Sequence, residues 1–154
     1  MEPAAEIERV GKAVLDAAFK VHTVPGPGLL ESVYEAALTY EMIQRGFTVE
    51  RQKAIPAIYE GIHLDVGFRA DLVVNGCVLV ELKAVEQMQP VFQKTTTTYL
   101  RLAGLKPGFL MNFNAAHLRD GITRFVNGLE EPPSLRPRPL VKGAQPLQRG
   151  FRRP

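Results

Sequence analysis

The chain has 154 residues, of which 45% are hydrophobic and 23% charged, as in ordinary globular proteins, and this length is enough for one domain with a buried core. The single cysteine, Cys77, excludes an internal disulfide and a zinc site of the Cys-x-x-Cys kind, so any metal ion must be held by oxygen atoms or by His. No apolar run is long enough to span a membrane, and we expect a cytoplasmic protein.

Positive charge gathers at the C-terminal end, although the total formal charge is only +3. Residues 130–154 hold six Lys or Arg and two Glu, a net charge of +4, which leaves −1 for residues 1–129. The same end holds six of the twelve prolines, a composition typical of extended, disordered segments. We therefore predict one domain over 1–128 and a basic tail over 129–154. The tail either attracts phosphate backbones or is a solvated segment without function.

Two helices are predicted at the start of the chain. Residues 4–22 repeat apolar side chains at spacings of three and four, the pattern of an amphipathic helix. The run Pro25-Gly26-Pro27-Gly28 ends it. A second helix is expected over 29–45, with a broad apolar face and with Gly46 as its C-terminal stop.

Short β-branched stretches separated by turn residues follow, and they predict an antiparallel meander over 47–57, 61–64, 68–74 and 77–83. Pro90 suits the first turn of a helix that runs to about Ala103 and stops at Gly104. We then expect a strand over 108–113 and a closing helix over 115–127. The predicted order is α-α-β-β-β-β-α-β-α, a mixed α/β domain.

Three charged residues, Asp71, Glu81 and Lys83, stand in an otherwise apolar hairpin over 71–83. If Asn75-Gly76 is a two-residue loop, Val74 pairs with Cys77, and both faces of the hairpin mix apolar and charged groups.

A three-residue loop with Gly76 in the left-handed conformation instead pairs Val73 with Cys77 and Asp71 with Leu79. One face then holds only Ala70, Leu72, Val78, Val80 and Leu82, and the other gathers Arg69, Asp71, Glu81 and Lys83. We favour this register because a buried face specifies strand pairing strongly. It makes Asp71 and Glu81 a diagonal pair about 7–8 Å apart at the backbone.

Two carboxylates at such a distance can share one cation. Mg²⁺ is commonly held by one or two carboxylates, waters and a substrate phosphate. Lys83 could then orient the attacking water or stabilise charge in the transition state. The alternative is a surface salt bridge among these residues and Arg69, and both interpretations stay open at this point.

The segment Asp71…Glu81-Leu82-Lys83, in a strand-turn-strand that follows a helix, resembles the PD-(D/E)XK nuclease superfamily. More narrowly, Gly28-Leu29-Leu30-Glu31-Ser32-Val33-Tyr34 is similar to the pattern that gives the GxxExxY family of small bacterial proteins its name. The likeness covers about residues 7–128, and its further segments are 65–72, 80–85, Tyr99-Leu100 and 112–114.

This resemblance implies a restriction-endonuclease-like fold of the α/β (α+β) class, with an α-β-β-β-α-β core and a mixed sheet flanked by helices. It implies Mg²⁺ or Mn²⁺ as cofactor, Asp71 and Glu81 as metal ligands and Lys83 as the catalytic lysine. Glu31 becomes the acidic residue that the first core helix sends toward the metal, directly or through water. An acidic residue in a first helical turn is also favoured by the helix dipole alone, and Tyr34 is predicted to be a core residue.

The helix after Lys83 departs from the family pattern. A Gln usually lies four residues before its Tyr-Leu pair, and here Thr95 takes that place. The run of four Thr at 95–98 is also poor helix material. Lys94 and Arg101, seven residues apart on one helix face, could contact phosphates or simply be solvated.

The histidines and the cysteine are weaker candidates for functional residues. The three histidines, His22, His63 and His117, are scattered without ligand spacing, and we expect them to be structural or exposed. Cys77 is interpreted as a small apolar residue.

We expect a metal-dependent nuclease that hydrolyses phosphodiester bonds in DNA rather than RNA. The alternative is a non-catalytic module that binds nucleic acid or protein on a nuclease-like fold, which the near-neutral charge of residues 1–129 favours. Hairpin edges in a small sheet make a homodimer plausible.

Overall fold

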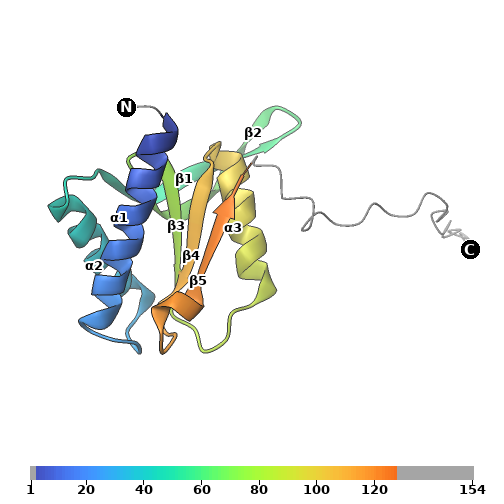
Figure 1. Cartoon of the computed structure of the whole chain (residues 1–154). Helices are drawn as coiled ribbons and strands as arrows, with labels where there is room; N and C mark the ends of the chain where they lie inside the picture. The colour runs from blue at the N-terminus through green and yellow to red at the C-terminus, as the bar shows by residue number, and fades with distance from the viewer. Residues whose placement is uncertain (1–2, 128–154) are drawn as a thin grey trace, which may run out of the picture.

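A five-stranded mixed sheet forms the middle of the molecule, and helices cover both of its faces (Figure 1). The computed structural model describes residues 3–127, and the predicted basic tail over 129–154 lies outside them. The strand order is β1-β2-β3-β4-β5, with β3 and β4 parallel and all other neighbours antiparallel. In chain order the elements are α1 (Pro3–Thr23), α2 (Glu31–Gln44), β1 (Val49–Tyr59), β2 (Ile62–Val74), β3 (Val78–Lys83), α3 (Pro90–Ala103), β4 (Pro107–Asn112), the 3₁₀ helix η1 (Leu118–Gly121) and β5 (Ile122–Val126).

The series α2-β1-β2-β3-α3-β4 is the expected α-β-β-β-α-β core, which confirms the restriction-endonuclease-like fold class. The three main helices begin and end close to their predicted limits. Gly46 and Gly104, the predicted stops, have φ values of 86° and 65°. This left-handed conformation ends a helix at little steric cost in glycine.

The predicted order of elements is wrong in two places. The strands predicted over 61–64 and 68–74 are one continuous strand, β2, because the residues between them also pair with β1 or extend alongside it. The closing helix over 115–127 is instead η1 followed by β5, which pairs antiparallel with β4. Ile122 packs on the side of α1 and α2, whereas Phe125 packs on the side of α3, as the twofold alternation of a strand requires.

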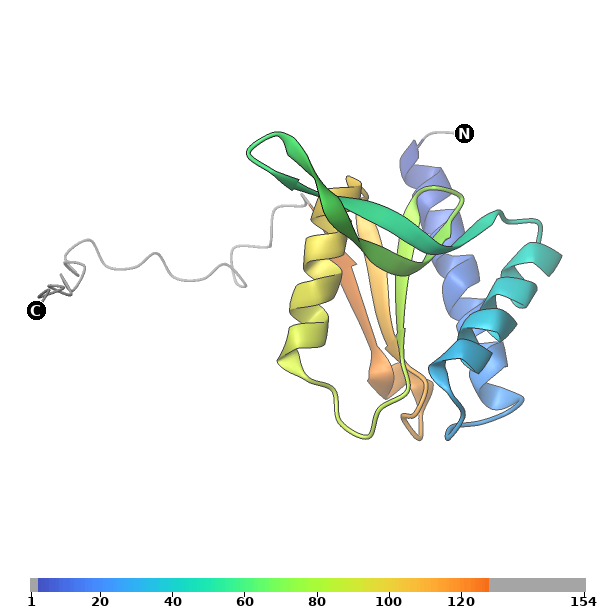
Figure 2. The ribbon, with the colours of Figure 1, turned by 180° about the vertical axis from the view of Figure 1, so that it is seen from behind.

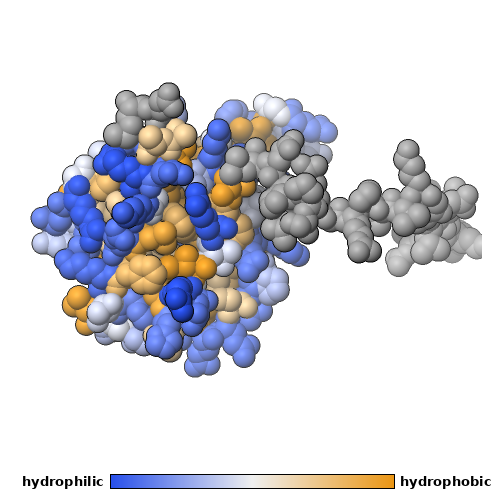
Figure 3. All heavy atoms as spheres, in the orientation of Figure 1, coloured by the Kyte–Doolittle hydropathy of each residue, from blue (hydrophilic) through white to orange (hydrophobic). Residues whose placement is uncertain are grey.

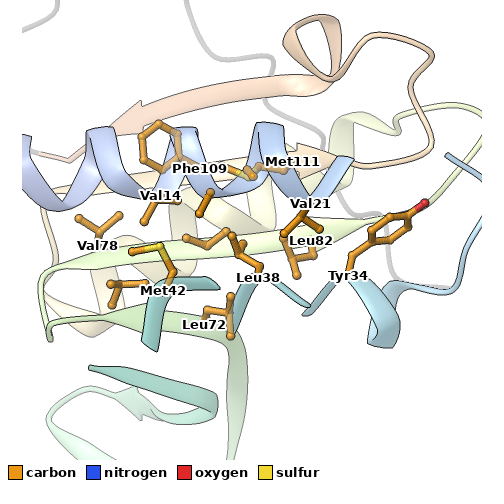
Figure 4. Close-up of a cluster of buried hydrophobic side chains, with 14 of the residues drawn as sticks. Val14, Val21, Tyr34, Leu38, Met42, Leu72, Val78, Leu82, Phe109 and Met111 are labelled. Carbon is orange, nitrogen blue, oxygen red and sulfur yellow. The ribbon is translucent and has the colours of Figure 1, made fainter. Parts of the chain in front are cut away.

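The larger hydrophobic core lies between the sheet and the helices α1 and α2 (Figure 4). Figure 4 shows Val14 and Val21 of α1, Leu38 and Met42 of α2, and sheet residues that include Leu82 and Met111 meeting in one layer. A smaller core on the opposite face joins α3 to the sheet through Ile55, Ala70, Val73, Leu79 and Leu100.

The outer side of the α1 layer is mostly hydrophilic, although hydrophobic residues reach the surface in the middle of that side (Figure 3). A groove there between α1 and the strands β4 and β5 is lined by residues that include Ile7, Leu15 and Phe109. Among the described residues no helix combines the length and apolar character needed to cross a membrane.

The distal halves of β1 and β2 form a two-stranded hairpin that projects beyond the rest of the sheet and past α3 (Figure 2). We call residues 56–68 the arm. Six large hydrophobic residues of the arm are exposed: Ile58, Tyr59, Ile62, Leu64, Val66 and Phe68. Phe68, at its base, is the least exposed of these and packs against Tyr99 of α3, with 5.3 Å between the ring centroids.

Candidate active site

The loop before α2 is fixed by Tyr34, which explains three positions of the Gly28-x-x-Glu31-x-x-Tyr34 motif. The Tyr34 hydroxyl donates to the Gly26 carbonyl at 2.6 Å and accepts from the Leu29 N–H at 3.1 Å. Its fully buried ring stacks on Phe113, and Gly28 has a φ of 98°. Tyr34 is therefore a core residue, as predicted, and the loop that it holds places Glu31 at the first residue of α2.

The turn between β2 and β3 sets the register of the two acidic residues. Asn75 and Gly76 have φ values of 48° and 63°, and the Cys77 N–H donates to the Val74 carbonyl at 3.0 Å. Three residues separate the paired Val74 and Val78, which confirms a three-residue connection with Gly76 left-handed. Asn75 is held there because its side chain accepts from the Thr48 N–H at 2.8 Å.

The predicted pairs Val73–Cys77 and Asp71–Leu79 are wrong, because Val73 pairs with Leu79. The turn lies one residue further along the chain than predicted, since Asn75 as well as Gly76 takes the left-handed conformation. Extended by one residue beyond the Leu72–Val80 pair, this register sets Asp71 directly opposite Glu81 rather than diagonal to it. Directly opposed residues have closer side chains than diagonal ones.

The predicted division into faces holds for most of the hairpin. Leu72, Val78, Val80 and Leu82 all pack in the core under α1 and α2. The prediction that Ala70 shares this face is wrong, because Ala70 packs with Ile55 and Leu100 on the α3 side. The pairing of β1 with β2 is irregular at Gln52 and Asp71, which changes the alternation of side chains at that point.

Asp71 and Glu81 are joined by two backbone hydrogen bonds. The Asp71 N–H donates to Oε1 of Glu81 at 3.0 Å, and the Leu82 N–H donates to Oδ2 of Asp71 at 2.8 Å. Each carboxylate thus accepts a hydrogen bond from the backbone of the other strand. Only 7% of Glu81 is exposed to solvent. The two carboxylates are therefore part of the hydrogen bonding between β2 and β3.

The surroundings of this pair disfavour negative charge. Burial, followed by the neighbouring charge of Asp71, raises the pKa of Glu81 to about 8. Burial also raises the pKa of Asp71, and burial raises that of Glu31 against the opposing effect of Lys83. Carboxylates with raised pKa values in one place are typical of functional sites, where a cation can supply the missing positive charge.

Lys83 ends β3 next to these carboxylates. Its Nζ lies 4.3 Å from the centroid of the Phe92 ring, at a distance typical of a cation–π contact. The Lys83 carbonyl accepts from the Phe113 N–H at 2.8 Å. Buried Asn112 binds the segment after Lys83 through its side-chain amide. Its Oδ1 accepts from the Val85 N–H at 3.1 Å, and its Nδ2 donates to the Val85 carbonyl at 2.9 Å. The 112–114 motif therefore fixes the chain immediately after Lys83.

Helix α3 presents one face to the site. Phe92, Thr95 and Tyr99 share that face by their spacing of three and four. Burial raises the pKa of Tyr99, and the negative charges of Glu81 and Asp71 raise it further. The four threonines at 95–98 lie within this helix despite their low helix propensity. Two of its hydroxyls, those of Thr96 and Thr97, donate to carbonyls one turn earlier, as Thr commonly does inside helices.

Lys94 and Arg101 are exposed, and their positions place them about 180° around α3 from Phe92 and Tyr99. The structure does not bring them to the carboxylates, so their contact with phosphates stays a prediction. His22 is buried with Nε2 2.8 Å from the Ala115 carbonyl, and His63 and His117 are exposed, in agreement with the expected structural or exposed roles.

Sequence reasoning missed Glu35 and Gln52. Glu35 lies one turn after Glu31 on α2, is 9% exposed, and accepts from Nε2 of Gln52 at both oxygens, at 3.2 and 3.1 Å. The same Nε2 lies 3.2 Å from Oδ1 of Asp71. The four-residue spacing from Glu31 could have pointed to Glu35, but no sequence signal marks Gln52.

Comparison with protein families finds a match to the model of the PD-(D/E)XK nuclease superfamily over residues 8–125. This range includes all the residues of the site described above. Comparisons with curated proteins and with solved structures found no match.

Proposed function

Since the chain belongs to the PD-(D/E)XK nuclease superfamily, we propose that it hydrolyses phosphodiester bonds in nucleic acid, DNA in preference to RNA. Nucleases of this superfamily generally use divalent metal ions, and we propose Mg²⁺ or Mn²⁺ here. The observation that carries the proposal is the interlocked pair of Asp71 and Glu81, with Lys83 two residues beyond Glu81 on the same strand.

The donor set fits a cation that keeps much of its hydration shell. Among residues 3–127, no three His, Cys, Asp or Glu side chains form a group able to hold a metal ion by themselves. Mg²⁺ needs fewer protein ligands, because waters and substrate phosphates complete its octahedral shell. Asp71 and Glu81 would hold the ion, and Glu31 would reach it directly or through a water. When bound, the cation supplies Lewis-acid charge for the phosphoryl oxygens.

Lys83 has the second role in this proposal. An ammonium group donates up to three hydrogen bonds, so Lys83 can hold the attacking water on the carboxylate side and stabilise the charge that develops on the phosphoryl oxygens. The ring of Phe92 beside Nζ restricts where the ammonium group can lie. Tyr34 and Asn112 act indirectly, since they fix the segments that carry Glu31 and Lys83.

Cleavage of DNA tests this proposal. The purified chain is incubated with plasmid and with single-stranded DNA in the presence of Mg²⁺, and we expect cleavage by wild type and none above background for Asp71→Asn. Asp65→Asn is the matched control, because Asp65 lies exposed on the same strand, within the arm, and this variant should cut like wild type. Equal cleavage by wild type and Asp71→Asn would contradict the proposal.

A second candidate is a non-catalytic module that binds nucleic acid or protein. It is favoured by the net charge of −1 over residues 1–129, since this charge suits protein partners and nucleic-acid-binding domains usually present a broad basic surface. It is also favoured by Thr95, which stands where the family pattern has Gln, on the face of α3 that meets the site. Calorimetric titration with Mg²⁺ separates the two functions, because a module of this kind would show neither metal binding nor cleavage.

We also propose a narrower family and an oligomeric state. The positions of Gly28, Glu31 and Tyr34 support membership of the GxxExxY family. The arm supports a homodimer, because its hydrophobic residues are exposed and β1 is an edge strand of the sheet.

A further inference from the structure

Gln52 has an unusual backbone conformation. It lies inside strand β1 and has a φ of 49°, in the left-handed region that residues with a side chain rarely adopt and that strands do not use. The other two described non-glycine residues with positive φ, Glu60 and Asn75, each precede a glycine in a turn. The pairing of β1 with β2 also passes from Arg51–Leu72 to Lys53–Ala70 without a pair at Gln52. Such strain persists only where the surroundings impose it.

The side chain of Gln52 shows what imposes it. Nε2 lies 3.1 and 3.2 Å from the two oxygens of Glu35 and 3.2 Å from Oδ1 of Asp71. All three partners are carboxylate oxygens, so the amide nitrogen, which is the donor, must face them. Because the Leu82 N–H holds Oδ2 of Asp71 at 2.8 Å, both oxygens of that carboxylate are held in place. The Gln52 carbonyl accepts from Arg69 at 3.2 Å.

We propose that Gln52 is a positioning residue, whose amide orients the Asp71 carboxylate for the divalent cation and keeps Glu35 beside it. This inference rests on the proposed function of the site. An amide suits the task because it donates to two carboxylates without adding a positive charge that would compete with the cation. The left-handed backbone places the amide between α2 and β2, so the strain at Gln52 serves the site and not the stability of the fold.

Substitution by glycine separates these two effects, because glycine adopts the left-handed conformation freely but has no amide. In the full chain, Gln52→Gly relieves the backbone strain but also removes the hydrogen bonds to Glu35 and Asp71. Because these two effects oppose each other, Tm should stay within about 4 °C of wild type. Mn²⁺ binding, measured by calorimetry, should weaken by about 10-fold. Gln52→Asn tolerates the same backbone but its amide is one methylene shorter, so it should also bind Mn²⁺ more weakly. A merely structural role would not weaken Mn²⁺ binding in a variant that folds about as stably as wild type.

The matched control is Glu60→Gly, at the tip of the arm, where φ is 48°. It relieves similar strain at the exposed end of the arm, where the Glu60 side chain makes no described hydrogen bond, so it should raise Tm and leave Mn²⁺ affinity unchanged. Wild-type Mn²⁺ affinity in Gln52→Gly would overturn the positioning role alone. A wild-type chain that binds no Mn²⁺ would overturn the proposed function, and the role of Gln52 with it.

Discussion

Glu81 gives the site a testable dependence on pH. Its pKa is about 8 in the folded protein and 4.5 in a free side chain, so between these values the folded state binds more protons than the unfolded state. The free energy of unfolding of the metal-free protein should therefore fall as pH rises from about 4.5 to about 8, by on the order of 1 kcal/mol per pH unit. Urea unfolding in the presence of EDTA, at pH 5 to 8, measures this slope.

Glu81→Gln should flatten that slope and make the metal-free protein more stable than wild type at pH 8, because the amide has no charge to desolvate. Glu86→Gln, an exposed position three residues beyond Lys83, is the control and should keep the wild-type slope. A wild-type slope in Glu81→Gln would show that another group carries the dependence.

Individual residues of the site differ in how far the sequence reveals them. Asp71, Glu81 and Lys83 are predictable because charged side chains stand out in an apolar hairpin. Gln52 is not, because its role depends on a backbone conformation that the neighbouring strand and α2 impose. Glu35 could also be taken for an ordinary helix residue, since its burial becomes evident only when Gln52 and Arg51 are brought against it.

At the scale of elements, periodicity predicts the three main helices well and fails where one pattern fits two structures. Leu118, Ile122 and Phe125 have helical spacing, yet Ile122 and Phe125 lie on opposite faces of strand β5. The free edge of β4 decides between the two structures, because pairing with β5 satisfies its backbone groups. The predicted hairpin turn lies one residue too early for a related reason: a contact from another segment, the hydrogen bond from Thr48 to Asn75, fixes the turn.

The arm is the element on which a dimer would depend. Its residues 56–68 include Glu60 and Asp65 and neither Lys nor Arg, so it is unsuited to phosphate backbones and better suited to an apolar surface on a second copy of the chain. Replacing Ile62 and Val66 by Ser should weaken self-association about 100-fold or more, because a symmetric dimer loses each contact twice. Sedimentation velocity over a range of concentrations measures this.

Val24→Ser is the control for the arm, because Val24 is 77% exposed and lies in the loop after α1. This variant should associate like wild type. A wild-type chain that stays monomeric at every concentration, or an arm variant that dimerises normally, would contradict a dimer through the arm.

At the scale of the whole molecule, the site lies where α2, β1, β2, β3 and α3 meet. Helix α2 provides Glu31 and Glu35, the three strands provide Gln52, Asp71, Glu81 and Lys83, and α3 faces them with Phe92 and Tyr99. The α-β-β-β-α-β order of the core could be predicted from the resemblance of the sequence, and with it the convergence of the acidic residues, whereas the closing strand β5 was not predicted. The contacts between them could not, since they depend on the exact register and on one strained residue.

The central claim is that Asp71 and Glu81 together bind a divalent cation. A crystal of the wild-type protein soaked in Mn²⁺ tests it most directly through the anomalous signal of the metal. We predict one peak in contact with carboxylate oxygens of both residues, and its loss in Asp71→Asn crystals. Absence of a peak between these two carboxylates in a fully soaked wild-type crystal, or a peak that Asp71→Asn leaves unchanged, would contradict the account.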